Sequence, residues 1–430
     1  MGFAMTLPTI DLLLRSNLIF TPSGLIDGHV AVADGRLAAV SPGAPDSRLL
    51  ASAAEVLDLT GHLVAPGFID VHTFFVGWLA EREGKTIDDP SLLANPAGVR
   101  DGFAAYQRLL HSRGVTTVKE MTFDAERGIP ELLASLQSDG ALSLNVHVMS
   151  QPVDAPLDLD TGRRLDALLT GPKVRFSGFN IMTDGSLSDH EAELLEPYVD
   201  GVAGPVVDWP AIEKAVLAAD DAGFRVALHA QGDRAVRRSL DLLERCRRDE
   251  SGRLLLRHAL TDLEMTDPVD LARMGRLGAV AEVYPQITSR RTHEQAAELL
   301  DTKVGPERRN RFWQRRAMAE AGVVLACATD LPLLIPDIPA SVDHACWGRF
   351  ADGGAALVDG RTLAPDELLR AWTAGGSWDL GTEQETGALV TGLRADIAVL
   401  DSNVLTARPE ALAAIEVVLT VAEGRIVYRR

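Results

Sequence analysis

Cysteine is scarce in this sequence, with 3 residues in a chain of 430. Cys246, Cys327 and Cys346 lie too far apart to form a disulfide framework or a cysteine-based metal motif. The chain therefore lacks the pattern of small secreted domains that are held together by disulfides. We expect a reducing, cytoplasmic location.

Basic residues are also in the minority, with 42 Lys and Arg against 61 Asp and Glu and a net charge of -19. The pairs Arg237-Arg238 and Arg308-Arg309 are typical of ordinary protein surfaces, and no basic stripe is present. Proteins that bind nucleic acid need such a stripe to neutralise phosphates. We therefore expect no nucleic-acid partner.

Long hydrophobic runs are absent, since none approaches the roughly 20 residues that span a bilayer. The first residues do not combine a basic segment with an apolar block, and residues 11–20 are typical of strand, turn and strand. We expect neither a signal peptide nor a membrane partner.

What the sequence does contain is enough apolar material for a large core and a smaller satellite, at 46% hydrophobic residues. Both ends are rich in short β signals, such as the Asp34-Gly35 turn between apolar runs and the runs at 395–401 and 416–428. We predict a small β-sandwich domain built from residues 1–64 plus 384–430.

The middle, residues 65–383, alternates apolar strand-like runs with amphipathic helical segments. Eight such runs are the number of a (β/α)8 TIM barrel, an α/β fold. The polar stretch from Phe75 to about Pro96 lies where a lid over the barrel mouth would lie. The predicted strands cover residues 68–72, 114–120, 142–149, 174–180, 225–229, 254–258, 279–283 and 323–330.

Polar side chains stand at the carboxyl ends of these runs, where TIM barrels carry their chemistry. Three imidazoles and one carboxylate there fit a catalytic zinc-type site, which needs neutral nitrogen ligands, an anionic oxygen and an open position for water. Each also has a structural interpretation, such as a turn for Asp330 or a satisfied buried hydroxyl for Tyr284. The strand-end residues are His72, Glu120, His147 or Gln151, Asn180, His229, His258, Tyr284 and Asp330.

The run Ala65 to His72 resembles the first barrel strand of the amidohydrolase superfamily. The resemblance extends over nearly the whole chain and is closest to the branch of N-substituted formamide deformylases and exoenzyme-regulator-like proteins. Further matching segments are residues 183–188, 229–235, 257–260, 328–332 and 387–396.

The resemblance implies a role for each matching residue. His72 matches a metal ligand of the first strand, and His229 and His258 match the ligands of the fifth and sixth strands. His72 and His258 are also expected to take part in catalysis. Asp330 matches the aspartate of the last strand, which binds the metal or its water and accepts the water's proton.

Two positions depart from the family pattern. Phe74 replaces the second histidine of the first strand, and Asn180 stands where relatives carry a bridging, carboxylated lysine. The resemblance therefore implies a single divalent metal, expected to be zinc, and not a binuclear centre. Glu120 is a hypothetical anionic ligand. The rival prediction is a metal-free site whose imidazoles act as acid and base groups.

Three residues are predicted to contact substrate, each with a structural alternative. Phe74 could stack on an aromatic substrate or pack the lid. Asp184 could contact substrate or form a turn. Tyr284 could hydrogen-bond an oxyanion.

The most favoured function is hydrolysis of an amide-type C–N bond, with Asp330 as general base and then acid, and His72 orienting the water. One alternative is a natural-product tailoring enzyme acting on a thiazoline or amidine in a modified peptide. Another is a non-catalytic binding or regulatory protein. The expected partners are a small-molecule or modified-peptide substrate and a second copy of the chain in a homodimer.

Overall fold

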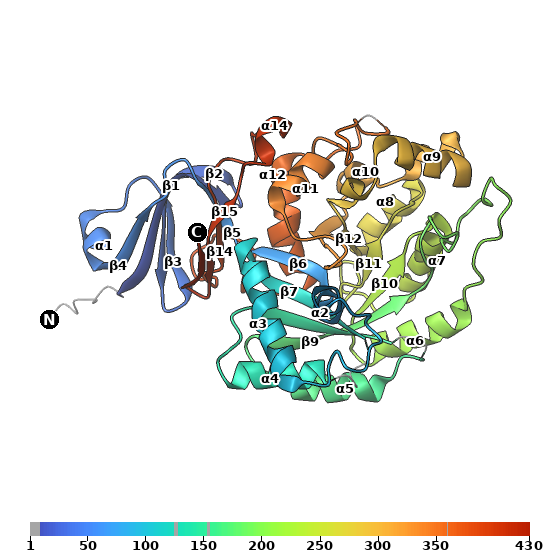
Figure 1. The fold of residues 1–430 in the computed structure, drawn as a ribbon, viewed down its shortest axis with the longest axis horizontal. Coiled ribbons are helices and arrows are strands. Elements are labelled where there is room, and N and C mark those ends of the chain that lie inside the picture. The colour runs from blue at the N-terminus through green and yellow to red at the C-terminus, as the bar shows by residue number, and fades with distance from the viewer. Residues whose placement is uncertain (1–8, 124–127, 153–154, 359) are drawn as a thin grey trace.

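The computed structural model describes residues 9–123, 128–152, 155–358 and 360–430. The chain forms two parts, a sheet made from both chain ends and a larger barrel with helices around it (Figure 1). Within the described residues, no helix combines the length and apolar character needed to cross a bilayer.

The terminal sheet has the order β16-β15-β14-β5-β1-β2-β3, with β4 paired to β1. Asp34 and Gly35, with φ of 50° and 73°, form the tight turn between β2 and β3 that the sequence predicts. The strands of the terminal sheet are β1 (Ile10–Thr21), β2 (Gly24–Ala33), β3 (Arg36–Pro42), β4 (Ala53–Asp58), β5 (Leu63–Pro66), β14 (Ile397–Leu400), β15 (Val417–Ala422) and β16 (Arg425–Arg429).

The two chain ends meet where β14 pairs antiparallel with β5, placing Ala398 opposite Ala65. The predicted sandwich part built from both termini is therefore confirmed, whereas its limits at residues 64 and 384 stay predictions. The backbone N–H of Gly67 also donates to the carbonyl of Asp396 at 2.8 Å, so the C-terminal segment holds the start of the barrel.

The second sheet contains eight parallel strands in the order β13-β12-β11-β10-β9-β8-β7-β6, which confirms the TIM barrel. A bridge between Thr73 and Leu331 closes the ring. Two backbone hydrogen bonds join the same strand ends, from Asp330 N to His72 O at 2.8 Å and from Phe74 N to Leu331 O at 2.9 Å. The strands are β6 (Phe68–Thr73), β7 (Val115–Phe123), β8 (Asn145–Gln151), β9 (Val174–Met182), β10 (Val226–Ala230), β11 (Ala259–Asp262), β12 (Val280–Val283) and β13 (Val324–Cys327).

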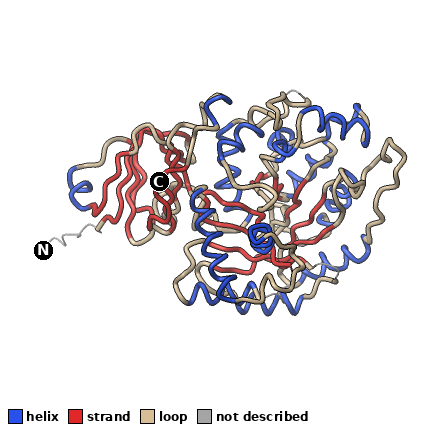
Figure 2. The backbone as a smooth tube through the Cα atoms, viewed as in Figure 1, coloured by secondary structure: helices blue, strands red, loops and turns tan. Residues whose placement is uncertain are grey.

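Helices surround the barrel (Figure 2). In α3 the buried residues Val99, Phe103, Tyr106 and Leu110 recur every three or four positions, which gives the helix one apolar face for the strands. The helices are α1 (Ser47–Ser52), α2 (Phe75–Glu83), α3 (Pro96–Ser112), α4 (Ile129–Ser138), α5 (Leu159–Leu168), α6 (Trp209–Asp221), α7 (Asp233–Leu243), α8 (Pro268–Leu277), α9 (His293–Lys303), α10 (Arg315–Glu320), α11 (Ile338–Ala345), α12 (Pro365–Arg370), α13 (Gly376–Asp379) and α14 (Pro409–Leu412).

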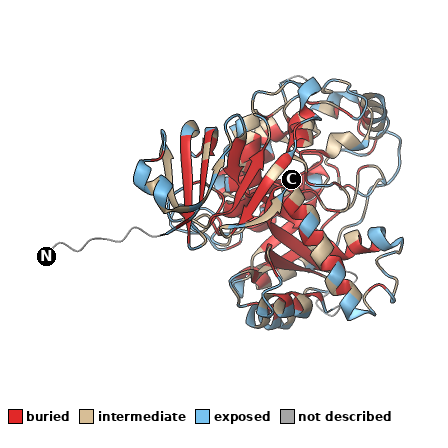
Figure 3. Cartoon of the chain, turned by 60° about the vertical axis from the view of Figure 1, so that its left-hand side comes forward, coloured by how far each residue is buried: buried red, intermediate tan, exposed pale blue. Residues whose placement is uncertain are grey.

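Burial is concentrated in the strands of both sheets (Figure 3). Inside the barrel an apolar cluster contains medium and small side chains from alternate strand positions. It includes Ile69, Val71, Met121, Met149, Ala227, Ala259, Val280 and Ala326.

Two expectations about local structure are wrong. The sixth strand is β11 at Ala259–Asp262, not residues 254–258; Leu255 of the expected strand is 49% exposed, so the leucine run does not enter the barrel wall. The expected irregular lid begins instead with α2, whose residues Phe75, Val76 and Leu79 are buried; only residues 84–95 carry no helix or strand.

Candidate functional site

Four titratable side chains from separate strand ends meet at the barrel mouth. His72 and His229 each lie one residue before the end of their strands, β6 and β10, while Asp262 ends β11 and Asp330 follows β13. His229 Nε2 lies 3.2 Å from Asp262 Oδ2, and His72 Nε2 lies 3.8 Å from Asp330 Oδ1. The structure thus brings together three residues singled out in the sequence and adds Asp262.

Asp330 is the most open of these groups, with 41% of its side chain exposed. Its φ is 52° and that of Asp262 is 73°, so both carboxylates stand on backbone in the left-handed region, which is uncommon for these residues and frequent at functional sites. Burial raises the pKa of Asp330 above its ordinary value, while His72 acts in the opposite direction. Asp330 can therefore exchange a proton with a molecule at the mouth.

His72 has a second carboxylate on its other side. Its Nδ1 lies 3.8 Å from Oε2 of Glu282 on β12, and both atoms are buried without a hydrogen-bond partner among the described residues. The other oxygen of Glu282 pairs with Lys119, which also contacts Asp379 Oδ2 at 3.1 Å. These buried charges inside the barrel compensate one another.

The charges around His72 set its proton affinity. Burial alone would lower the pKa of His72, but Glu282 and Asp330 outweigh it and raise that pKa. Burial would raise the pKa of Glu282, but Lys119 and His72 outweigh burial and hold that pKa below its ordinary value. Glu282 therefore stays ionised beside an imidazole that readily carries a proton. Sequence reasoning missed Glu282 and Lys119, although each is a charged residue within an apolar strand.

His258 lies elsewhere, so the prediction that it joins the mouth as ligand and catalytic residue is wrong. It precedes β11, four residues before Asp262, and such a stretch spans roughly 13 Å in extended chain. Its Nδ1 accepts the backbone N–H of Val226, the first residue of β10, at 3.0 Å. The strand end assigned to His258 is occupied by Asp262.

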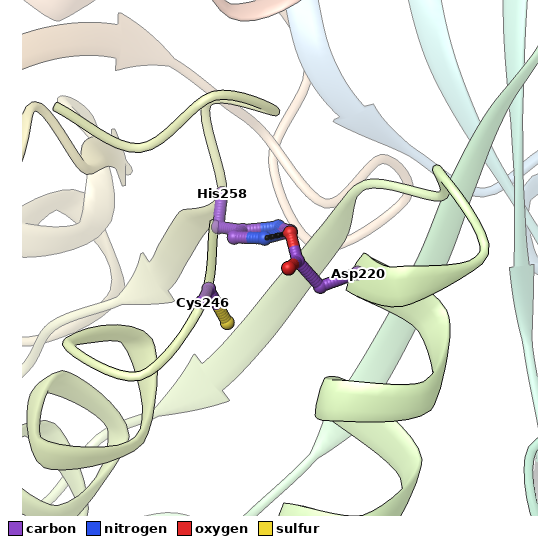
Figure 4. A group of neighbouring side chains, drawn as sticks. All are labelled: Asp220, Cys246 and His258. Atoms are coloured by element: carbon purple, nitrogen blue, oxygen red, sulfur yellow. Dashed lines mark hydrogen bonds and ion pairs between the residues drawn. The ribbon is translucent and has the colours of Figure 1, made fainter. Parts of the chain in front are cut away.

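The surroundings of His258 hold three donor atoms within 4.8 Å of one another, from Asp220, Cys246 and His258 (Figure 4). Because His258 Nδ1 accepts a hydrogen bond, the ring proton of the neutral imidazole is on Nε2, which lies 3.0 Å from Asp220 Oδ1. The nitrogen that would bind an ion thus carries a proton. Burial also raises the pKa of the Cys246 thiol to about 12, so this group is a structural hydrogen-bond cluster.

Glu120 faces away from the barrel interior, so the hypothesis that it binds a metal is wrong. Its neighbour Lys119 points inward, and alternation along the strand sends Glu120 to the helix layer. There it accepts hydrogen bonds from Phe75 N at 2.5 Å, Thr73 Oγ1 at 2.9 Å and Tyr106 OH at 3.2 Å.

Asp184 forms hydrogen bonds with two loops, which favours its interpretation as a turn residue over contact with substrate. Its carboxylate accepts the backbone N–H groups of Gln231, Gly232 and Glu193 at 2.8–2.9 Å, and its side chain is fully buried. The predicted contact of Asp184 with substrate is therefore contradicted, because its oxygens are already occupied and covered.

Phe74, Tyr284 and Asn180 are buried, and each contacts another side chain. The ring of Phe74 packs edge-on against Phe123, with centroids 4.1 Å apart. The Tyr284 hydroxyl is buried, 3.4 Å from Asp262 Oδ2, which makes it a support for that carboxylate. Asn180 donates to Gln151 Oε1 at 2.8 Å. Substrate contacts of Phe74 and Tyr284 remain predictions.

The side chains at the mouth are of the types that bind a metal ion, since imidazole nitrogens and carboxylates are typical zinc ligands. With metal–ligand bonds of about 2.0–2.2 Å, two ligands of one tetrahedral ion lie roughly 3.3 Å apart. The His229–Asp262 pair has this spacing. Within the described chain, no three donors of the mouth lie within 4.8 Å of one another, so the fit rests on this pair.

Comparison with known proteins gives one family. The model described as "Amidohydrolase family" matches residues 73–428. YtcJ of Bacillus subtilis (strain 168) is 24% identical over 61% of this chain, which spans about half of its length (49%). The imidazolonepropionase of Streptococcus sanguinis (strain SK36) is 25% identical over 92% of both chains.

Solved structures share the fold. A metal-dependent hydrolase of Pyrococcus furiosus has a TM-score of 0.71 at 19% identity, covering 92% of this chain and 100% of its own. A zinc-bound adenosine deaminase of Xanthomonas campestris has a TM-score of 0.61 at 17% identity, covering 98% and 94%. At these identities the likeness concerns the fold alone.

Proposed function

Because the chain belongs to the amidohydrolase family, we propose that it hydrolyses an amide-type C–N bond at the mouth of its barrel. The observation that carries the proposal is the meeting of His72, His229, Asp262 and Asp330 at four strand ends. This set offers two ligand types, an accessible base and a proton-carrying imidazole.

One divalent ion, with zinc as the proposed metal, would be held mainly by His229 and Asp262. When bound, such an ion supplies hydroxide near neutral pH, because it lowers the pKa of its water from about 15.7 to about 7. Asp262 replaces His258 in the ligand set that the sequence predicts, and Tyr284 steadies its carboxylate.

The chain's own residues move the protons. Asp330 accepts a proton from the attacking water and returns it to the leaving amine, since its carboxylate is the exposed one. His72 directs Nε2 toward Asp330 and stabilises negative charge there, while Glu282 faces its other nitrogen.

The charge of the mouth favours one substrate variant, a cationic amidine-type group in a modified peptide. Asp262, Asp330 and the nearby Glu264 add carboxylates, and the cations that face them among the described residues are the Arg291 guanidinium beside Glu264 and the imidazole of His72. An Asp330→Asn variant separates an enzyme from a binding protein. Turnover should fall by about 100-fold or more while the circular dichroism spectrum stays unchanged; undiminished turnover would contradict the assigned base.

Metal content of the purified protein, measured by plasma mass spectrometry, tests the ligand assignment. We expect about one ion per chain, lost in His229→Ala and Asp262→Ala. The control is His258→Gln, which alters the other end of the strand and should keep its ion. Absence of stoichiometric metal after reconstitution, or loss in the His258 variant alone, would overturn the assignment.

A further inference from the structure

A pocket of about 50 Å³ lies among the segments that follow β12 and β13. Its lining includes Arg309, Arg315, Arg361 and His344, with Phe312 and Trp313 as aromatic walls. None of the described residues that line it is acidic, in a chain whose net charge is -19. The pocket therefore concentrates positive charge on an otherwise negative protein.

Arg315 is the central observation, because it is buried (5% exposed) and has no ionic partner among the described residues. One Nη donates to the carbonyl of Tyr284 at 3.0 Å, and the guanidinium carbon lies 5.5 Å from the Trp313 ring. Its Nε is buried and has no hydrogen-bond partner in the part of the chain that the structure describes. Burial lowers the pKa of Arg315 to about 10, so it is still charged at neutral pH. Buried charges are normally paired, since an isolated one is costly to desolvate.

The neighbouring cations differ in how far they are neutralised. Arg309 forms an ion pair with Asp301, with Nε 2.6 Å from Oδ1. Arg361 donates to the neutral amide oxygen of Gln314 at 3.0 Å and has no carboxylate partner in the described part of the chain. The pocket thus has two guanidinium groups, Arg315 and Arg361, whose charge the described residues leave uncompensated.

We propose that this pocket binds a small oxyanion, of the phosphate, sulfate or carboxylate type, through Arg315 and Arg361. A planar guanidinium presents paired N–H donors that match the oxygens of such an ion. The cavity volume admits a compact ion, and the rings of Phe312 and Trp313 keep the contact in a low-dielectric setting where it is strong.

The pocket is linked to the catalytic mouth through one residue. Arg315 contacts the Tyr284 carbonyl, and the Tyr284 hydroxyl lies 3.4 Å from Asp262. The bound oxyanion is then either a free ion, which would stabilise the end of β12, or an acidic group of the substrate. Binding to the pocket does not depend on the proposed hydrolysis.

Thermal unfolding of the full chain in inorganic phosphate, with sodium chloride at matched ionic strength as reference, tests the proposal. Phosphate should raise Tm saturably, by about 2 °C or more at 100-fold excess over Kd. Arg315→Met should lose this response. It should also unfold no earlier than wild type without phosphate, because the unpaired buried charge is gone. The control Arg290→Met removes an exposed arginine outside the pocket and should keep the response.

Equal phosphate responses in wild type and Arg315→Met would overturn the proposal, since a general salt effect acts on both. No response in wild type with phosphate, sulfate or acetate would overturn it as well. Where binding is found, kinetics distinguish the sources: phosphate that competes with substrate marks a subsite for its acidic group, and phosphate that leaves KM unchanged marks a separate ion.

Discussion

At the scale of single residues, the mouth depends on which nitrogen of His72 carries a proton. Glu282, ionised by Lys119, faces Nδ1, and Asp330 faces Nε2. An ionised carboxylate favours a proton on the nitrogen beside it, as carboxylates do for metal-ligating and catalytic histidines. Glu282 is therefore a positioning residue for His72. It faces the imidazole from inside the barrel and not from the substrate side.

Replacing Glu282 by Gln should lower kcat by about 10- to 100-fold with little change in KM, because the amide no longer favours the Nδ1 proton. Steady-state kinetics check the split, and nitrogen NMR of the His72 ring should show the altered proton position. The matched control is Asp379→Asn, which removes a carboxylate from the same Lys119 but does not face His72. Equal losses in both variants would indicate a structural role only.

At the scale of elements, Glu120 joins the end of β6 to α3. It accepts hydrogen bonds from Thr73 and Phe75 on one side and from Tyr106 on the other. Burial raises the pKa of Glu120 from an ordinary 4.5 to about 8. The folded state thus holds this proton at pH values where the unfolded chain has lost it. By linkage, the stabilisation is complete below pH 4.5 and disappears as the pH rises towards 8.

A Glu120→Gln variant should flatten this pH dependence. We expect wild type to lose about 1–3 kcal/mol of unfolding free energy between pH 5 and pH 8 from this group, a loss that the permanently neutral amide avoids. Denaturant unfolding at the two pH values measures it. Parallel pH profiles for the two proteins would show that Glu120 is ionised throughout that range.

Elements also show what the sequence could and could not predict. Seven barrel strands were predicted because buried parallel strands are continuous apolar runs, as in Phe68 to Val71. The sixth was displaced because Leu254 to Leu256 is more apolar than the true strand, Ala259–Asp262. Because of that displacement, the sequence predicts His258 at the position in the site where the structure has Asp262. Glu282 and Lys119 were missed because their pairing joins strands 163 positions apart.

At the scale of the whole molecule, the terminal sheet and the barrel meet at Gly114. Its φ is +78°, and an added Cβ would lie 2.8 Å from the Phe68 ring and 2.9 Å from Cβ of Ala398 in the terminal sheet. Thr420 Oγ1 of the same sheet donates to the His111 carbonyl at 2.7 Å. The two parts are therefore packed closely where the barrel's second strand begins.

Gly114→Ala should destabilise the protein by about 2–4 kcal/mol, through left-handed backbone strain and a clash between the two parts. Gly140→Ala is the control, since its φ is +67° but no atom of the described residues lies within 4 Å of an added Cβ, and it should cost about 1–2 kcal/mol. Urea unfolding compares them. Equal effects would mean that the interface adapts to the extra methyl group.

The closure of the barrel between β6 and the segment after β13 has a consequence for how this protein can change. His72 and Asp330 are joined by a main-chain hydrogen bond, so their spacing is fixed by the ring itself. The irregular segment at residues 84–95, between α2 and α3, contributes nothing to that bond. Sequence divergence or engineering can therefore change such loops while the spacing of His72 and Asp330, the pair proposed to move protons, stays in place. The choice of substrate can then change independently of the proposed chemistry.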